Sequence, residues 1–181
     1  MLALVFMLTS CENSPKVEDP KKVAEDHNDA KFKATNESDA QFLVNAAEIH
    51  LEEIKLGELA QTSGTMLEVK KLGEMMKTDH AKSLKDLQGL AAQKQVTLPM
   101  AITEDGQTSY NKLMDKKGVA FDKAYSEMSV SGHKSAIEKF DKASTTVTDP
   151  DIKAWASSML PTLRAHLDAS MTCQKNCEKM R

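Results

Sequence analysis

The chain has 181 residues and a formal net charge of −3, so it is long enough for one domain with a substantial core. Aromatic residues make up only 4% of it, and Gly and Pro are scarce beside Ala, Leu, Lys, Glu and Met, a composition that favours helices over strands. The charge is nearly balanced and alternates in sign along the predicted helices, so it provides no basic face for a nucleic acid partner.

The first eleven residues are typical of a targeting segment. Met1–Leu8 is an uncharged apolar run, too short to span a bilayer, and Leu8-Thr9-Ser10-Cys11 follows it directly. This arrangement resembles the signal of bacterial lipoproteins, in which small residues precede a cysteine that becomes the lipidated N-terminus. The resemblance implies a signal at residues 1–10 and a lipid on Cys11, which would anchor a periplasmic or outer-membrane lipoprotein to a membrane of the bacterial cell envelope. The alternative is the start of a buried helix or strand with an incidental cysteine.

Residues 11–37 are predicted to form a disordered tether. They contain Pro15, Pro20 and many charged residues, with only scattered apolar side chains. Such a segment buries too little surface to offset the entropy lost on ordering. His27 lies in this stretch, and we expect it to face water.

Two long helices are predicted next. Ser38-Asp39-Ala40-Gln41 fits a capping box and opens the first of them, which ends at Ser63-Gly64. Thr65-Met66-Leu67-Glu68 is a second capping box and starts the second helix, Met66–Gln93. The short turn between these two helices forces them into an antiparallel hairpin.

The segment Val96–Lys117 is predicted to cross over to a second hairpin. Pro99 prevents simple continuation of the preceding helix, and Glu104–Lys116 can form a short helix of its own. A third long helix is predicted over Val119–Val147, and Asp149-Pro150-Asp151 marks the start of a fourth, with Asp149 at its cap.

The predicted fold is therefore all-α. Residues 38–171 form two antiparallel helical hairpins joined by a crossover with a short extra helix, which is the ferritin-like arrangement of a four-helix bundle. Plain up-down topology with a looped crossover is the alternative.

Each long helix carries a titratable side chain near the middle of its apolar stripe. These inward residues are Glu53, His80, His133 and His166. At about 1.5 Å of rise per residue from the hairpin turn, His133 and His166 lie at the same level of the bundle. The same count leaves Glu53 and His80 offset by roughly 7 Å.

Two further residues lie at the edges of these stripes. His50 is closer than Glu53 to the level of His80, so it could replace or join that carboxylate. Asp79 could orient one of the histidines, or it could face water, which is the preferred interpretation.

Two interpretations of the inward residues remain open. Three imidazoles and a carboxylate can hold a single transition metal ion such as Zn, Fe or Cu. The preferred alternative is a buried hydrogen-bonded network in which the carboxylate neutralises one histidine, because buried polar groups are normally satisfied internally. The chain contains no Glu-x-x-His motif, which argues against the ferroxidase chemistry of di-iron bundles.

Four segments resemble, in order and context, a family of bacterial envelope proteins grouped as domain of unknown function 4142. They are Leu56–Ala60, Met76–His80, Gly118–Tyr125 and Leu160–Leu167. The Phe-Asp-x-x-Tyr and Leu-Pro-x-Leu-x-x-His pieces are the specific ones, and the resemblance covers roughly Ser38–Ala169. It implies a ferritin-like fold, an envelope compartment and no settled activity, and it places the four inward residues where the family carries its own. The chain departs from the family at Gly132, where Asp is usual.

The C-terminal segment 172–181 is predicted to be a tail rich in Cys and Met. Cys173 and Cys177 are four residues apart, so a continuing helix would place them on one face. They could form a disulfide, strained if the segment is helical, or stay as free thiols. Alternatively they could bind a soft metal such as Cu(I).

The sequence supports two classes of function. The first is a non-enzymatic binding or stress-protection module, anchored in the envelope, whose helical bundle could hold a metal. The second is a metal-dependent oxidoreductase of the same shape. Because no nucleophile, Gly-rich loop or paired-carboxylate motif accompanies the inward residues, the non-enzymatic class is preferred and no catalytic residue is assigned.

Overall fold

The computed structural model describes residues 18–32 and 34–180, and the predicted signal and the Cys11 anchor lie outside them. Every element of secondary structure in the described part is a helix, so the prediction of an all-α bundle is confirmed. The helices are α1 (Pro20–Asp29), α2 (Ala34–Ser63), α3 (Leu67–Lys94), α4 (Glu104–Met114), α5 (Gly118–Thr146) and α6 (Pro150–Glu178).

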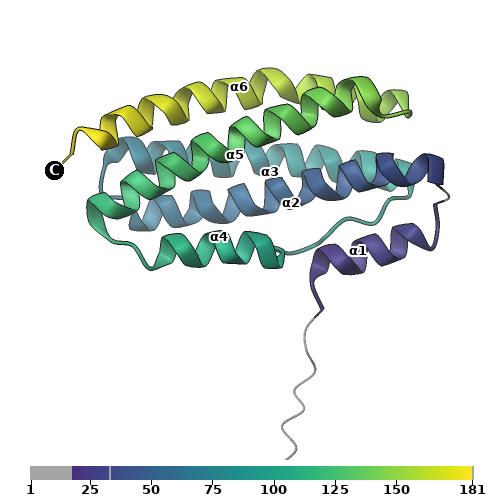
Figure 1. The fold of residues 1–181 in the computed structure, drawn as a ribbon, viewed down its shortest axis with the longest axis horizontal. Helices are drawn as coiled ribbons and strands as arrows, with labels where there is room; N and C mark the ends of the chain where they lie inside the picture. The colour runs from purple at the N-terminus through teal and green to yellow at the C-terminus, as the bar shows by residue number, and fades with distance from the viewer. Residues whose placement is uncertain (1–17, 33, 181) are drawn as a thin grey trace, which may run out of the picture.

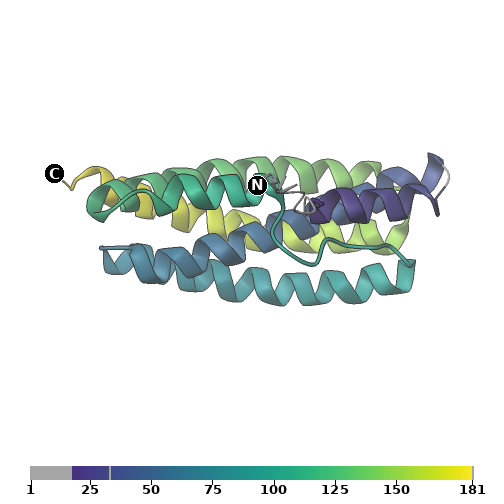
Figure 2. The same cartoon turned by 90° about the horizontal axis from the view of Figure 1, so that it is seen from below.

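The four long helices form two antiparallel hairpins, α2–α3 and α5–α6, and each hairpin makes the most extensive helix contacts in the molecule (Figure 1). The connection from α3 returns along the bundle through α4, so α3 and α5 run in the same direction (Figure 2). Both α1 and α4 pack on α2, on one side of the bundle. This is the two-hairpin crossover expected from the sequence, and membership of the ferritin-like class stays a prediction.

The helix boundaries agree closely with the sequence analysis, but the capping boxes do not. Helix α2 begins at Ala34, so Ser38 lies inside the helix and cannot cap it. The N-cap of α3 is Met66, which makes no side-chain capping bond. The first box was wrong because α2 begins four residues before Ser38. At the second box a tertiary contact replaces the local cap, since Asp122 binds the backbone N–H groups of Thr65 and Met66.

A buried carboxylate from the opposite hairpin closes the turn at the start of α3. Asp122 of α5 accepts hydrogen bonds from the backbone N–H groups of Thr65 at 2.8 Å and Met66 at 2.9 Å. It is 0% exposed. A negative charge at a helix N-terminus also interacts favourably with the helix dipole.

The other hairpin turn is closed in the same way. Asp39 of α2 accepts bonds from the backbone of Thr148 and Asp149 and from the Thr148 hydroxyl, at 2.7–3.0 Å. The two hairpins therefore clamp each other's turns, one at each end of the bundle. This reciprocal arrangement fixes their register along the bundle axis.

The segment predicted to be a disordered tether contains helix α1. Asp19 caps α1 and also accepts a bond from the backbone N–H of Glu104. The Asn28 side chain pairs with both backbone groups of Thr97, at 2.8 and 2.9 Å. The prediction was wrong for 20–29 because these polar contacts with a distant crossover leave no trace in local hydrophobicity.

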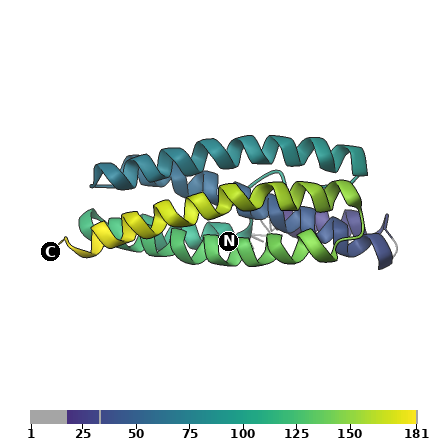
Figure 3. The same ribbon diagram turned by 90° about the horizontal axis from the view of Figure 1, so that it is seen from above.

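The C-terminal segment is also part of the bundle. Helix α6 runs without a break to Glu178 (Figure 3). It includes Cys173 and Cys177, and both are buried. The predicted tail therefore begins only after Glu178. The helix continues because its apolar stripe continues, so the two thiols pack into the core as small apolar groups.

The Asp122 clamp can be tested by substitution. Asp122→Ala leaves two N–H groups at the α2–α3 turn without a partner, and we expect it to lower the free energy of unfolding by about 1–3 kcal/mol. Asp141→Ala on the exposed face of the same helix should change it by less than about 0.5 kcal/mol. Urea denaturation of both variants measures the difference. Equal stabilities would contradict the clamp.

Candidate metal centre

A layer of polar side chains divides the core into two apolar halves. The first half contains Leu43, Leu87, Phe140 and Leu163, and the second contains Leu56, Leu72, Phe121 and Tyr125. The polar layer between them is buried to 8% exposure or less and consists of His50, Glu53, His80, His133 and His166. All four long helices contribute to it, each from near its middle.

Three of these side chains point a nitrogen at one another. His133 Nε2 lies 3.4 Å from His80 Nε2 and 3.3 Å from His166 Nδ1. One ligand atom from each of the three histidines lies within 4.8 Å of the others. Two nitrogens bound at about 2.1 Å to one tetrahedral metal ion are separated by about 3.4 Å. The two short separations therefore match those of a metal's ligands.

The outer nitrogens of two rings are held by groups that accept hydrogen bonds. His133 Nδ1 lies 2.9 Å from the carbonyl oxygen of Ser129, so this nitrogen must donate. His166 Nε2 lies 2.9 Å from Asp79 Oδ2, so it donates to that carboxylate. Asp79 is at the surface with 44% of its side chain exposed, but it also orients His166. It therefore faces both water and the site.

These outer bonds determine what the inner nitrogens can do. A neutral imidazole has one N–H and one lone pair. In their neutral forms, His133 and His166 each donate their one N–H to an outer acceptor. The lone pairs of His133 Nε2 and His166 Nδ1 then face each other at 3.3 Å. Such a pair is not a hydrogen bond. Only a positive charge between the two nitrogens, a proton or a metal ion, makes the contact attractive.

The third ring, His80, is paired with His50. Their Nδ1 atoms are 2.9 Å apart, so one donates to the other. If His80 donates, its Nε2 presents a third lone pair to the group. If His50 donates, His80 Nε2 carries the proton and bonds His133. In either case His50 Nε2 has no partner among the described residues.

Burial favours the neutral forms of His50, His80 and His133. It lowers the pKa of His50 to about 3 and that of His133 to about 4. The pKa of His80 is lowered well below its usual value, by burial first and then by the three neighbouring histidines. Neutral imidazoles are the form that binds metals.

Glu53 lies beside the centre and does not join it. Its Oε1 atom is 3.6 Å from His133 Nδ1, on the side of the ring that faces Ser129. The carboxyl packs against Gly132, where an added Cβ would approach Oε1 to 3.3 Å. Burial, with a smaller contribution from Glu52, raises the pKa of Glu53 to about 8. We therefore expect a protonated carboxyl at neutral pH.

Ser129, whose carbonyl oxygen holds the orientation of the His133 ring, was not among the residues predicted from the sequence. Ser129 also bonds the hydroxyl of Ser170 at 2.8 Å, and Ser170 donates to the carbonyl of His166. The signal was present in the spacing, since each serine is four residues from a histidine on the same helix face. Serine is too common in helices for that spacing to have been decisive.

The pKa shifts predict how the metal-free protein responds to pH. Between pH 6.5 and about 4, His50 and His133 bind more protons in the unfolded chain, so stability falls as pH falls. Between pH 4.5 and about 8, Glu53 binds more protons in the folded chain, so its contribution falls as pH rises. The pKa of His80 is lowered as well, so below pH 6.5 three histidines act against one carboxyl. Stability should therefore be greatest near pH 6.5, and each group contributes at most about 1.4 kcal/mol per pH unit.

Urea denaturation in the presence of chelator, from pH 4 to 8, measures this profile. Glu53→Gln should flatten the alkaline limb and leave the acid limb in place. An alkaline limb unchanged by this substitution would show that Glu53 titrates normally in the folded protein.

No helix in the described part of the chain is long and apolar enough to cross a membrane. Comparison with known proteins found no match among curated proteins and none among solved structures. One family model does match, over residues 24–172, and its description is "Domain of unknown function (DUF4142)". That range covers most of the chain and includes all three converging histidines. The chain is therefore a member of the DUF4142 family.

Proposed function

We propose that this protein is a binding module of the cell envelope that holds a single transition metal ion between His80, His133 and His166. The observation that carries the proposal is the contact between His133 Nε2 and His166 Nδ1, where two lone pairs lie 3.3 Å apart in the core. A buried network of neutral groups does not account for this contact. A divalent cation does, and it would also engage His80.

The donor set indicates the class of metal. Three neutral imidazoles suit Zn(II), Cu(II) or Fe(II), and a four-coordinate ion keeps one position for water or another small ligand. The carboxylate of Asp79 holds His166 in the ligating tautomer, the arrangement that orients metal-bound histidines and raises their basicity. Asp79 also supplies the nearest negative charge to offset that of the ion.

The chemistry favours holding a metal over oxidising one. In di-iron bundles, carboxylates from several helices bridge the two metals. Here the described residues contribute three imidazoles to the convergent group, and the one nearby buried carboxyl, Glu53, lies on the far side of His133. The oxidoreductase alternative has no such specific contact in its favour.

The envelope location is part of the same proposal. It rests on the apolar run Met1–Leu8 and on Leu8-Thr9-Ser10-Cys11 directly after it. A lipid on Cys11 would tether the bundle to a membrane through residues 12–17, which precede the described part.

Metal binding can be tested by melting curves and metal analysis. Zn(II), Cu(II) or Fe(II) should bind at one ion per chain and stabilise the protein by about 2.7 kcal/mol at a hundred times the dissociation constant. His133→Ala and His166→Ala should each abolish this binding and this stabilisation. His27→Ala, a change to an exposed histidine on α1, should alter neither.

The result that contradicts the proposal is equally specific. If a proton rather than a metal lies between the rings, no metal will raise the melting temperature of the wild type. His133→Ala would then destabilise the metal-free protein by about 1–3 kcal/mol, because Ser129 and the neighbouring rings lose a partner.

Anchoring is tested by fractionating a bacterial host that expresses the full chain. We expect the wild type in the membrane fraction with a lipid on Cys11, and Cys11→Ser in the soluble fraction or unprocessed, because a lipid supplies the membrane affinity. Mass spectrometry of the N-terminus provides the direct readout. A soluble wild type that still begins at Met1 would refute the anchor.

A further inference from the structure

The second apolar half of the core is rich in sulfur. It contains Cys173 and Cys177, and packed in or against it are Met66, Met75, Met76 and Met128. In the first half, the described residues contribute one sulfur, that of Met159. Sulfur in a core usually serves as flexible filler. Here, however, the same half of the core also holds two thiols, and Met75 and Cys173 line one pocket.

The two thiols are neighbours on one face of α6. Both are buried, at 4% and 0% exposure, and both are free. They are one helical turn apart, where Cβ atoms lie about 5–6 Å apart. A disulfide needs about 3.8 Å. Because α6 is continuous from Pro150 to Glu178, it keeps the pair as thiols.

The same geometry suits a metal bridge. Metal–sulfur bonds of about 2.3 Å place two thiolates roughly 4 Å apart or slightly more, a span that side chains one turn apart can reach. Burial, and then the neighbouring Cys177 thiol, raise the pKa of Cys173 to about 12. Such a thiol is not a nucleophile at neutral pH. A coordinating metal nevertheless deprotonates it.

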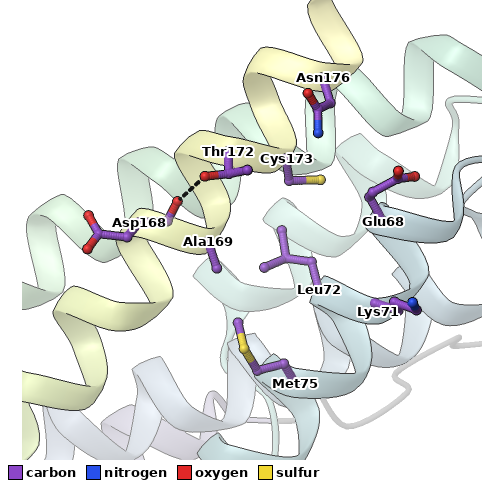
Figure 4. A pocket seen from close by; sticks show the side chains of 9 residues that line it. All are labelled: Glu68, Lys71, Leu72, Met75, Asp168, Ala169, Thr172, Cys173 and Asn176. Carbon is purple, nitrogen blue, oxygen red and sulfur yellow. Dashed lines mark hydrogen bonds between the residues drawn. The ribbon is translucent and has the colours of Figure 1, made fainter.

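A pocket of about 440 Å³ lies between α3 and α6, and one cysteine of the pair, Cys173, lines it (Figure 4). Met75 and Cys173 both line it, and in Figure 4 the two side chains extend into the space between the helices. Glu68 and Asp168 also line the pocket and outnumber its one cationic residue, Lys71. The pocket therefore offers two sulfur atoms and an excess of negative charge, which favours a soft cation.

We propose that Cys173, Cys177 and Met75 form a second metal site, selective for Cu(I), that is entered through the pocket between α3 and α6. Thiolate and thioether ligands select Cu(I), whereas the imidazoles of the first site suit Zn(II), Cu(II) or Fe(II). On binding, the two S–H bonds break, Cu(I) forms bonds to the two thiolates and to the thioether sulfur of Met75, and two protons pass to solvent. The copper stays Cu(I) throughout, so no oxidant or reductant is needed.

The test is an anaerobic titration of the reduced full chain with Cu(I) against a chromophoric Cu(I) chelator. The His133→Ala background removes the first site, and we expect one Cu(I) per chain to remain bound. Adding Cys173→Ala or Cys177→Ala should weaken this binding about 100-fold or more, and Met75→Leu about tenfold. Cys11→Ser, the matched cysteine control, should leave it unchanged. Affinity unaffected by the Cys173 and Cys177 changes would overturn the proposal.

A second measurement uses the wild type and does not depend on how the variants fold. X-ray absorption at the copper edge distinguishes sulfur from nitrogen ligands. Copper bound at one equivalent should show sulfur neighbours, and nitrogen neighbours alone would refute the site. The two sites are thus tested separately. Failure of the histidines to bind metal would not affect the evidence for copper–sulfur bonds, and absence of copper–sulfur bonds would not affect the histidine site.

Discussion

The architecture depends on two imidazole nitrogens, His133 Nε2 and His166 Nδ1, held 3.3 Å apart with their lone pairs facing. Each ring is fixed from outside the pair, one by the Ser129 carbonyl and the other by Asp79. A buried polar group without a partner costs free energy, and two that repel cost more. A positive charge between the two nitrogens makes the contact attractive, and the proposed metal ion would supply it while also binding His80.

The rings meet because the hairpins are locked in register. Asp122 closes the α2–α3 turn from α5, and Asp39 closes the α5–α6 turn from α2. A slip of one helical turn, about 5.4 Å, would break both clamps and separate the histidines. Close contact between α2 and α3 adds a lateral constraint, since a Cβ on Gly57 would lie 2.6 Å from the carbonyl oxygen of Gly73. Only glycine allows the backbones to approach so closely.

The sequence predicted the long helices to within a few residues because apolar periodicity is a local signal, except at the end of α6, which runs to Glu178 and not to about residue 171. It predicted the level of His133 and His166 for the same reason, since helical rise is regular. What it could not predict depends on distant contacts. Helix α1 is held by its contacts with the crossover, and Asp79 contacts His166 across the bundle. The rotation of α2 about its axis places His50, and not Glu53, beside His80. Glu53 and His50 lie one turn apart, and Glu53 was preferred because it lies within the predicted apolar stripe whereas His50 lies at its edge.

The preference for a hydrogen-bonded network over a metal was reasonable from sequence because the two differ only in ring orientation. A hydrogen-bonded network and a metal site both require buried histidines on facing helices, and both leave the apolar periodicity of the helices unchanged. The observation behind the proposed metal site is the direction of two hydrogen bonds. The outer nitrogens of His133 and His166 both donate, so in their neutral forms these two rings have no proton to share where their inner nitrogens converge. In the sulfur-rich half of the core the same reasoning applies to geometry, because a continuous helix keeps two thiols too far apart for a disulfide and close enough for one soft ion. The bundle thus places nitrogen and sulfur donors in separate layers, and ligand type rather than pocket shape would decide which metal each layer accepts.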